Sequence, residues 1–228
     1  MKKSIAAWMM MFALGTAAYA DDRSDDVERL RKAGTILNEI MSAPDQGIPT
    51  EIIGSARCIA VVPSMLKAGL GFGGAYGKGV ASCKTGSGWS APAFFAVKGG
   101  SFGLQIGGQA VDVVMLIMNE EGMKNLLASK FKLGADASVA AGPVGRLAEG
   151  STDWKMRAQV LTYSRARGVF AGITLNGAVI NQHKDDTRAF YGRMVPFKTI
   201  LTGGVGAPGD AAPWISSLRK HAGGGSSK

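Results

Sequence analysis

The sequence predicts a single α+β domain with a largely antiparallel β-sheet core and flanking helices. A glycine-rich tract from Met65 to Gly108 interleaves glycines with large apolar side chains, which favours tightly packed β-structure or a binding surface made of backbone. Short apolar runs in this region are bounded by glycine or proline, as is typical of strands. Amphipathic helical patterns precede and follow it. No repeat or interdomain linker divides the chain.

The N-terminus has the pattern of a secretory signal peptide. Lys2 and Lys3 precede an apolar run, and Ala18-Tyr19-Ala20 matches a small-x-small cleavage site. We therefore expect a periplasmic or secreted protein that is peripheral to a membrane, because no later stretch is long enough to span one. The expected division is a signal peptide at 1–20, a domain at 21–222 and a flexible tail at 223–228.

The charge balance is basic. The formal net charge of +9 falls to +7 when the two lysines of the signal peptide are removed. A basic exported protein suggests anionic partners such as phospholipid headgroups, whereas export argues against nucleic acid. The charges are dispersed along the chain, so a merely solubilising role is an equal alternative.

The two cysteines, Cys58 and Cys83, lie in short β-like runs. Neighbouring strands could bring them together in an oxidising compartment, and the bridge would contribute roughly 3 kcal/mol by chain entropy. Two buried free thiols are the alternative, because cross-strand disulfide geometry is demanding.

The first element of the domain is an amphipathic helix over about 25–42. Asp25 can cap it with Glu28 three residues later, and apolar residues recur at helical spacing. Its polar side carries Arg29, Arg31 and Lys32 together with acidic residues, and a mixed-charge face is usually only solvated. Pro49 starts a second short helix that runs through Ala56.

Strands should dominate the region from there to about residue 118. The run 111–118 is apolar apart from Asp112, so it reads as a central strand that is buried on both faces. The other predicted strands are 59–62, 80–84, 93–98 and 102–106.

The second half of the chain mixes short helices and strands. Asn176-Gly177 is a hairpin signal between a strand at 169–175 and a second one at 178–181. Short helices are expected at 121–129, 185–192, 197–201 and 214–221.

Short catalytic patterns occur, but their contexts do not fit. The dinucleotide pattern at Gly69 runs into further glycines and lacks its acidic partner. Gly99-x-Ser101-x-Gly103 matches a nucleophile elbow, yet the residues after it look extended rather than helical. A serine hydrolase that uses Ser101 is a remote alternative. The two histidines and two cysteines form no metal-binding pattern, and we expect no cofactor.

Seven separated stretches carry a resemblance to a known family. They are 59–79, 89–94, 107–112, 133–136, 141–146, 163–172 and 191–192. In this order they resemble the signature of the SYLF domain family, a lipid- and actin-binding module first described in endocytic proteins that also carry SH3 domains. The similarity extends from about residue 30 to 220.

The resemblance implies a non-enzymatic domain that binds phosphoinositides or other anionic lipids. Eukaryotic members contact lipid through an amphipathic helix at the start of the domain, which corresponds here to the helix at 25–42. For an exported bacterial-type protein we do not expect actin as a partner. The residues assigned to lipid binding are Arg29, Arg31, Lys32, Lys67, Lys78, Arg165 and Arg167.

The sequence thus predicts an exported, non-enzymatic protein that binds anionic phospholipid or phosphoinositide-like headgroups. The alternative is an envelope structural or protein-interaction module that uses the apolar glycine-rich surface for a protein partner.

Overall fold

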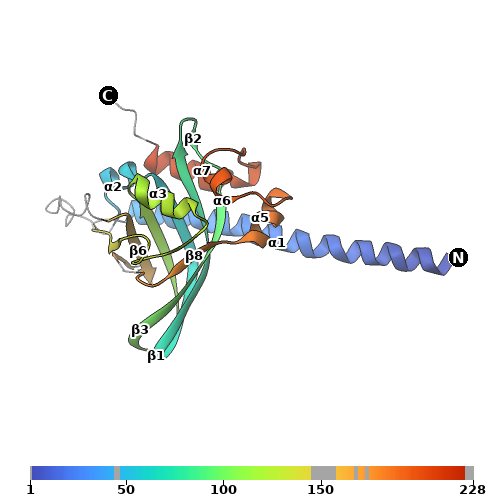
Figure 1. Cartoon of the computed structure of the whole chain (residues 1–228), viewed down its shortest axis with the longest axis horizontal. Helices are drawn as coiled ribbons and strands as arrows, with labels where there is room; N and C mark the ends of the chain where they lie inside the picture. Colours follow the sequence, from blue (N-terminus) through green and yellow to red (C-terminus); the bar gives the residue numbers. More distant parts are fainter. Residues whose placement is uncertain (1, 44–46, 145–157, 167–168, 173–174, 224–228) are drawn as a thin grey trace.

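The computed structural model describes the chain except for residues 1, 44–46, 145–157, 167–168, 173–174 and 224–228. For 2–21, 68–72, 100–108, 166 and 169–172 it describes the backbone alone. One curled, mostly antiparallel sheet forms the centre of the molecule, and helices flank it (Figure 1). The predicted fold class is confirmed.

Two long strands organise the sheet. β1 (Cys58–Thr85) and β3 (Ala93–Ile117) are antiparallel partners over almost their whole length. The short β2 (Gly88–Trp89) closes the turn after β1. On the other side of β3, β6 (Val160–Ala166) pairs with its C-terminal part and β8 (Val179–Gln182) with its N-terminal part.

Three short strands complete the sheet. β4 (Lys130–Lys132) pairs with β8, and β7 (Val169–Gly172) pairs with β6. β5 (Val139–Ala141) runs parallel to β6, while every other pairing of the named strands is antiparallel.

The β1–β3 pair doubles back on itself. Both strands run out to a shared tip and return to the body (Figure 1), and their register shifts between Leu70 and Gly71. Where the halves of β1 stack, a Cβ on Gly77 would lie 2.5 Å from Cγ1 of Val62. A Cβ on Gly79 would lie 2.6 Å from the backbone oxygen of Val61. These two positions therefore need glycine because the strand packs against itself.

A disulfide joins the same two halves of β1. Cys58 and Cys83 are bonded across a sequence separation of 25 residues. Closing a loop of this length contributes about 3.5 kcal/mol in the chain-entropy treatment. The sequence left open a disulfide or two buried free thiols, and the structure has the disulfide.

The helices cover the sheet. α1 (Lys2–Ser42) packs its C-terminal half on the body next to α5 (Lys184–Tyr191) and α7 (Ala212–Ala222), and its N-terminal half projects away (Figure 1). The remaining helices are α2 (Thr50–Ser55), α3 (Glu120–Leu127), α6 (Phe197–Leu201) and the 3₁₀ turn η2 (Gly209–Ala211).

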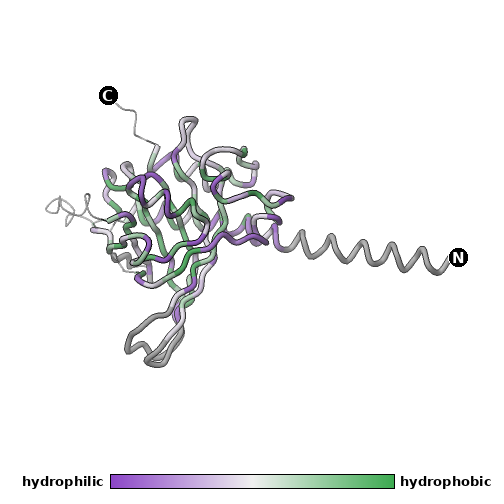
Figure 2. The backbone as a smooth tube through the Cα atoms, in the orientation of Figure 1, coloured by the Kyte–Doolittle hydropathy of each residue, from purple (hydrophilic) through white to green (hydrophobic). Residues whose placement is uncertain are grey.

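The core lies on both faces of the central strands. Val113 and Met115 belong to a cluster with α3 and α6, whereas Val114 and Leu116 belong to a cluster with α1, α2 and α7. The prediction of a central strand buried on both faces is thus confirmed. Figure 2 shows the hydrophobic stretches gathered in the strands of the body.

Several predicted boundaries were wrong. The strands predicted at 59–62 and 80–84 are one strand, and so are those at 93–98, 102–106 and 111–118. The glycines between them do not end a strand, because a continuous partner strand supplies hydrogen bonds through the whole tract. The predicted helix at 25–42 is the second part of α1, because the preceding residues, rich in Ala and Met, also favour helix.

The predicted hairpin around Asn176-Gly177 was also wrong. The turn exists, with Gly177 at φ +83°, but its flanking strands do not pair with each other. β7 pairs with β6, and β8 pairs with β3 and β4. The backbone N–H of Gly177 donates to the carbonyl oxygen of Leu133, so tertiary contacts rather than local pairing fix this turn.

Candidate functional site

Five of the seven basic residues assigned to lipid binding meet at one groove between α1 and β1. The groove consists of two adjoining hollows of about 240 and 420 Å³ that share Glu28, Lys32, Pro63 and Ser64. Its basic lining residues are Arg29, Arg31, Lys32, Lys78 and Arg165. We call it the α1 groove.

A bulge in β1 shapes the wall of the α1 groove. The register against β3 shifts between Val62 and Met65, and Ser64 adopts a φ of +50°. The backbone N–H of Ser64 donates to Oδ1 of Asp112 at 2.9 Å. The bulge interrupts the pairing and turns this short piece of backbone toward α1.

A buried ion network lies beneath the groove. Arg29 pairs with Asp26 at 2.5 Å and with Asp186 at 2.9 Å. Lys78 reaches the other oxygen of Asp186 at 2.9 Å, and Nδ1 of His183 lies 3.0 Å from it. The network thus links α1, β1 and α5, and it pairs two of the predicted lipid ligands, Arg29 and Lys78, with carboxylates of the protein.

The two carboxylates of this network differ in their pKa values. Burial, with a smaller contribution from the charge of Asp186, raises the pKa of Asp26 to about 7, although Arg29 opposes the shift. Burial would also raise the pKa of Asp186, but its contact with His183, the hydrogen bond from Lys78 and the charge of Arg29 lower it overall. Oδ2 of Asp26 is buried without a hydrogen-bond partner in the described part of the chain.

The basic residues at the rim of the groove are also matched by acids. Lys32 pairs with Glu28 at 2.7 Å, and Arg165 pairs with Asp112 at 2.6 Å and with Glu39. Arg31 is exposed and has no ion pair within the described residues. Counting the network below, five basic side chains meet six acidic ones, so their formal charges nearly cancel. The acidic side chains are Asp25, Asp26, Glu28, Glu39, Asp112 and Asp186.

Of the other two assigned residues, Lys67 does not line the groove. Lys67 lies on β1 opposite Gln109, where partial burial lowers its pKa. Arg167 lies outside the described residues.

A second basic surface lies on the sheet beyond the groove. Tyr76 on β1 is opposite Lys98 on β3, Lys98 is opposite Val179 on β8, and Val179 is opposite Lys132 on β4. A second row of cross-strand partners lies next to this one. It runs from Lys78 on β1 across β3 and β8 to Lys130 on β4. Residues directly opposite in neighbouring strands point to the same side of a sheet, so these side chains share a face.

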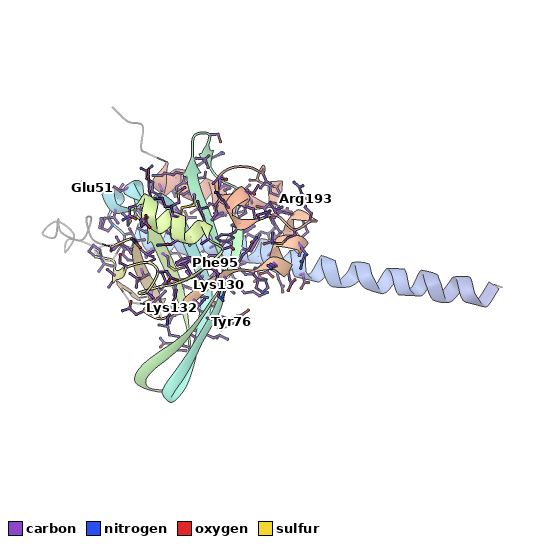
Figure 3. The ribbon with its side chains drawn as sticks, in the orientation of Figure 1. Glu51, Tyr76, Phe95, Lys130, Lys132 and Arg193 are labelled. Atoms are coloured by element: carbon purple, nitrogen blue, oxygen red, sulfur yellow. A yellow bond between two sulfur atoms is a disulfide. The ribbon has the colours of Figure 1, made fainter. Side chains whose placement is uncertain are left out.

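We call Tyr76, Lys98, Lys130 and Lys132 the lysine face. All four are exposed, and Lys98 lies 5.7 Å from the centre of the Tyr76 ring. None of the three lysines has an ion pair within the described part of the chain. One acid is near, since Oδ2 of Asp136 accepts from the backbone N–H of Lys132. Figure 3 shows Tyr76, Lys130 and Lys132 close together where the β1–β3 pair leaves the body.

The sequence reasoning missed the lysine face. Its members are spread over β1, β3 and β4, so only the sheet register brings them together. A weak signal was present in Lys130-Phe131-Lys132, where a buried aromatic residue separates two exposed lysines, as expected for an edge strand with one solvated face.

The nucleophile-elbow pattern does not form its expected structure. Ser101 lies within β3 opposite Gly73, and no helix follows it. His183 caps α5 through Nδ1, and Nε2 of His221 lies 2.8 Å from Oδ1 of Asn38. Within the described residues there is no group of three or more His, Cys, Asp or Glu side chains that could hold a metal ion.

Comparison with known proteins identifies the family. Residues 98–221 match the family described as Ysc84, Las17-binding protein actin regulator. The chain is 35% identical over 205 residues to Protein YSC84 of Saccharomyces cerevisiae, which covers 84% of this chain and 43% of that protein. The chain belongs to the Ysc84/SYLF family. Another relative is SH3 domain-containing YSC84-like protein 1 of Rattus norvegicus, 33% identical over 79% of this chain and 55% of that protein.

This chain therefore spans about half the length of the curated relatives it matches. The relatives are named as binding or SH3-containing proteins, among them LAS seventeen-binding protein 3 of Saccharomyces cerevisiae at 34% identity over 84% of this chain and 44% of that protein. None of these names denotes an enzyme. No helix among the described residues has the length and apolarity needed to cross a membrane.

Several stretches that resemble the Ysc84/SYLF signature hold the fold together. Asp112 and Arg165 come from two different stretches and pair with each other beside the β1 bulge. The ring of Tyr163 lies over Gly142, where an added Cβ would be 2.0 Å away. The hydroxyl of Tyr191 donates to the carbonyl oxygen of Pro92 at 2.7 Å. These residues have architectural roles that need no ligand.

Proposed function

We propose that this chain is an exported, non-enzymatic protein that binds anionic lipid headgroups at a membrane surface. The observation that carries the proposal is the lysine face, whose three ammonium groups are exposed without ion-pair partners in the described structure. Neighbouring strands are about 4.8 Å apart, so Lys98 and Lys132 lie roughly 10 Å from each other across β8. Charges spread at this spacing can meet several headgroups of a planar surface at once.

Tyr76 suits the same role. It is 42% exposed, and its ring lies beside Lys98. Tyrosine is favoured at membrane interfaces because its ring is apolar and its hydroxyl stays in water. A lysine next to such a ring combines attraction to phosphate with contact to the boundary between headgroups and acyl chains.

In this proposal the α1 groove contributes less to lipid binding than the lysine face does. Four of its five basic side chains, all except Arg31, already have carboxylate partners, and a lipid phosphate would have to displace them. An isolated exposed pair is worth only about 0–1 kcal/mol, so Lys32 could exchange partners, but Glu28 would then repel the same anionic surface. The assignment of Arg29, Arg31 and Lys32 to lipid binding stays a prediction, and in this proposal they are secondary to the lysine face.

Vesicle co-sedimentation tests the proposal. The purified protein should bind vesicles increasingly as phosphatidylglycerol replaces phosphatidylcholine, and the bound fraction should fall between 0.05 and about 0.5 M NaCl because salt screens exposed charges. Binding that is indifferent to both lipid charge and ionic strength would contradict the proposal.

A protein-interaction module is the second candidate. It is favoured by the relatives' names, which refer to Las17 binding and actin regulation. Absence of actin as a partner is a prediction from the expected export, and it can be checked by co-sedimentation with filamentous actin. Saturable binding to filaments without any binding to vesicles would favour this candidate.

A further inference from the structure

The β1–β3 pair extends beyond the rest of the sheet. Pairing of β8 with β3 stops at Lys98, and pairing of β6 with β3 starts at Asp112. Between these points β1 is the only partner of β3 among the described residues. This stretch of the register begins at Leu66 opposite Ala110 and ends at Tyr76 opposite Lys98. We call residues 66–76 and 98–110 the ribbon. It is the part that projects from the body in Figure 1.

The composition of the ribbon changes from its base to its tip. Its only charged residues are Lys67 and Lys98, both close to the base. The distal stretches 68–74 and 99–108 carry no charge, and apart from Ser101 and Gln105 they consist of glycine, alanine and large apolar residues. The large apolar residues in these stretches are Leu70, Phe72, Phe102, Leu104 and Ile106.

The base of the ribbon also displays apolar surface. Among the described residues three large hydrophobic side chains are exposed, and two of them, Leu66 and Tyr76, lie on β1 at the base of the ribbon. Soluble proteins rarely concentrate exposed apolar groups without a partner for them. The lysine face borders the same base at Tyr76 and Lys98, so cationic side chains lie beside the point where the uncharged part begins.

We propose that the distal ribbon inserts into the interfacial layer of an anionic bilayer while the lysine face holds the headgroups around it. The inference rests on the proposed function and adds the segment that enters the membrane. An uncharged projection with cationic side chains beside its base matches the two layers of a membrane surface, apolar below and negatively charged above.

The depth of insertion is limited by the backbone. A two-stranded ribbon leaves N–H and C=O groups unpaired along its edges, and such edges are not tolerated in the hydrocarbon core. The ribbon should therefore stop at roughly 5–10 Å, where water and headgroups still reach these groups. Insertion of this kind anchors a protein peripherally without spanning the bilayer.

An environment-sensitive probe tests the insertion directly. Cys58 and Cys83 are bonded to each other, so Ser101→Cys supplies a single free thiol in the ribbon for an NBD label. With phosphatidylglycerol vesicles its emission should increase and shift to shorter wavelength, and nitroxide-labelled lipids should quench it. The same label on Ser216→Cys, an exposed position on α7, should not respond.

Charge insertion provides a second test. Phe102→Asp should weaken vesicle binding by about tenfold or more. The transfer free energy lost with one large apolar side chain is by itself enough for about a tenfold loss of affinity. Met194→Asp is the matched control, since Met194 is 36% exposed and lies between α5 and α6, away from the ribbon. It should change binding less than about threefold, as expected for one added charge outside the contact surface.

The outcomes separate the two proposals. If the wild-type protein does not bind anionic vesicles, the proposed function fails. If it binds but the label on Ser101→Cys does not respond and Phe102→Asp binds as tightly as Met194→Asp, lipid binding stands and ribbon insertion is overturned. A response of the label to a protein partner but not to vesicles would overturn insertion as well and would assign the ribbon to protein docking.

Discussion

The α1 groove contains five basic residues and the lysine face three, and the two regions use them differently. In the groove Arg29, Lys78 and Arg165 are held by carboxylates from other elements, so the charges tie α1 and α5 to the sheet. On the lysine face Lys98, Lys130 and Lys132 project from strands without such partners in the described structure. A count of basic residues therefore does not locate an anion-binding surface, whereas their pairing state does.

The largest expected difference between the two regions is in stability. Arg29→Met should lower the free energy of unfolding by about 3–5 kcal/mol, because it leaves the buried Asp26 without its cationic partner and removes one of the partners of Asp186. Arg188→Met is a suitable control, since Arg188 pairs with Asp185 at the surface and its loss should cost less than about 1 kcal/mol. Urea denaturation measures both. Equal effects of the two substitutions would show that the network does not hold the fold.

The buried network beneath the α1 groove should make the stability of the protein depend on pH through Asp26. Asp26 has a pKa of about 7 in the folded protein and 3.8 as its ordinary value, so the folded state binds the proton more tightly. Its contribution to stability is complete below pH 3.8 and is lost as the pH rises through about 7. Between pH 5 and 8 this corresponds to a loss of about 3 kcal/mol.

Asp26→Asn should remove this loss, because an amide does not titrate. The difference between variant and wild type isolates Asp26 from two other shifts. The lowered pKa of Asp186 acts only below about pH 4, and the lowered pKa of His221 acts equally in both proteins. Denaturation at pH 5 and pH 8 gives the measurement. A difference between the two proteins that is the same at both pH values would contradict the assignment.

The sequence predicted the elements better than it predicted the surfaces. Capping residues and apolar spacing placed α2, α5, α6 and α7 to within a few residues, because these signals are local. The continuity of β1 and β3 was missed, because glycines that usually interrupt a strand are here required where β1 stacks on itself.

The site was predictable only in part. The family resemblance assigned Arg29, Arg31, Lys32, Lys78 and Arg165 to lipid binding, and in the structure all five line the α1 groove. Their neutralisation was not foreseeable, because Asp186 lies more than 100 residues from Lys78 and Asp112 lies 53 residues from Arg165. The lysine face depends on the register of four strands, which no local pattern contains.

The central claim is that the lysine face, rather than the α1 groove, contacts anionic lipid. Two matched double variants test it, because each removes two exposed positive charges: Lys130→Gln with Lys132→Gln, and Arg31→Gln with Lys32→Gln. Affinity for phosphatidylglycerol vesicles should be measured for both at the same ionic strength, together with their melting temperatures.

The account predicts that the Lys130 and Lys132 variant binds about 30-fold more weakly than wild type, since each lysine near an anionic surface contributes about 1 kcal/mol. The Arg31 and Lys32 variant should stay within about threefold of wild type, the residual effect of lowering the net charge away from the contact. A strong loss for the Arg31 and Lys32 variant with near-normal binding of the Lys130 and Lys132 variant would contradict the claim and return the lipid site to α1.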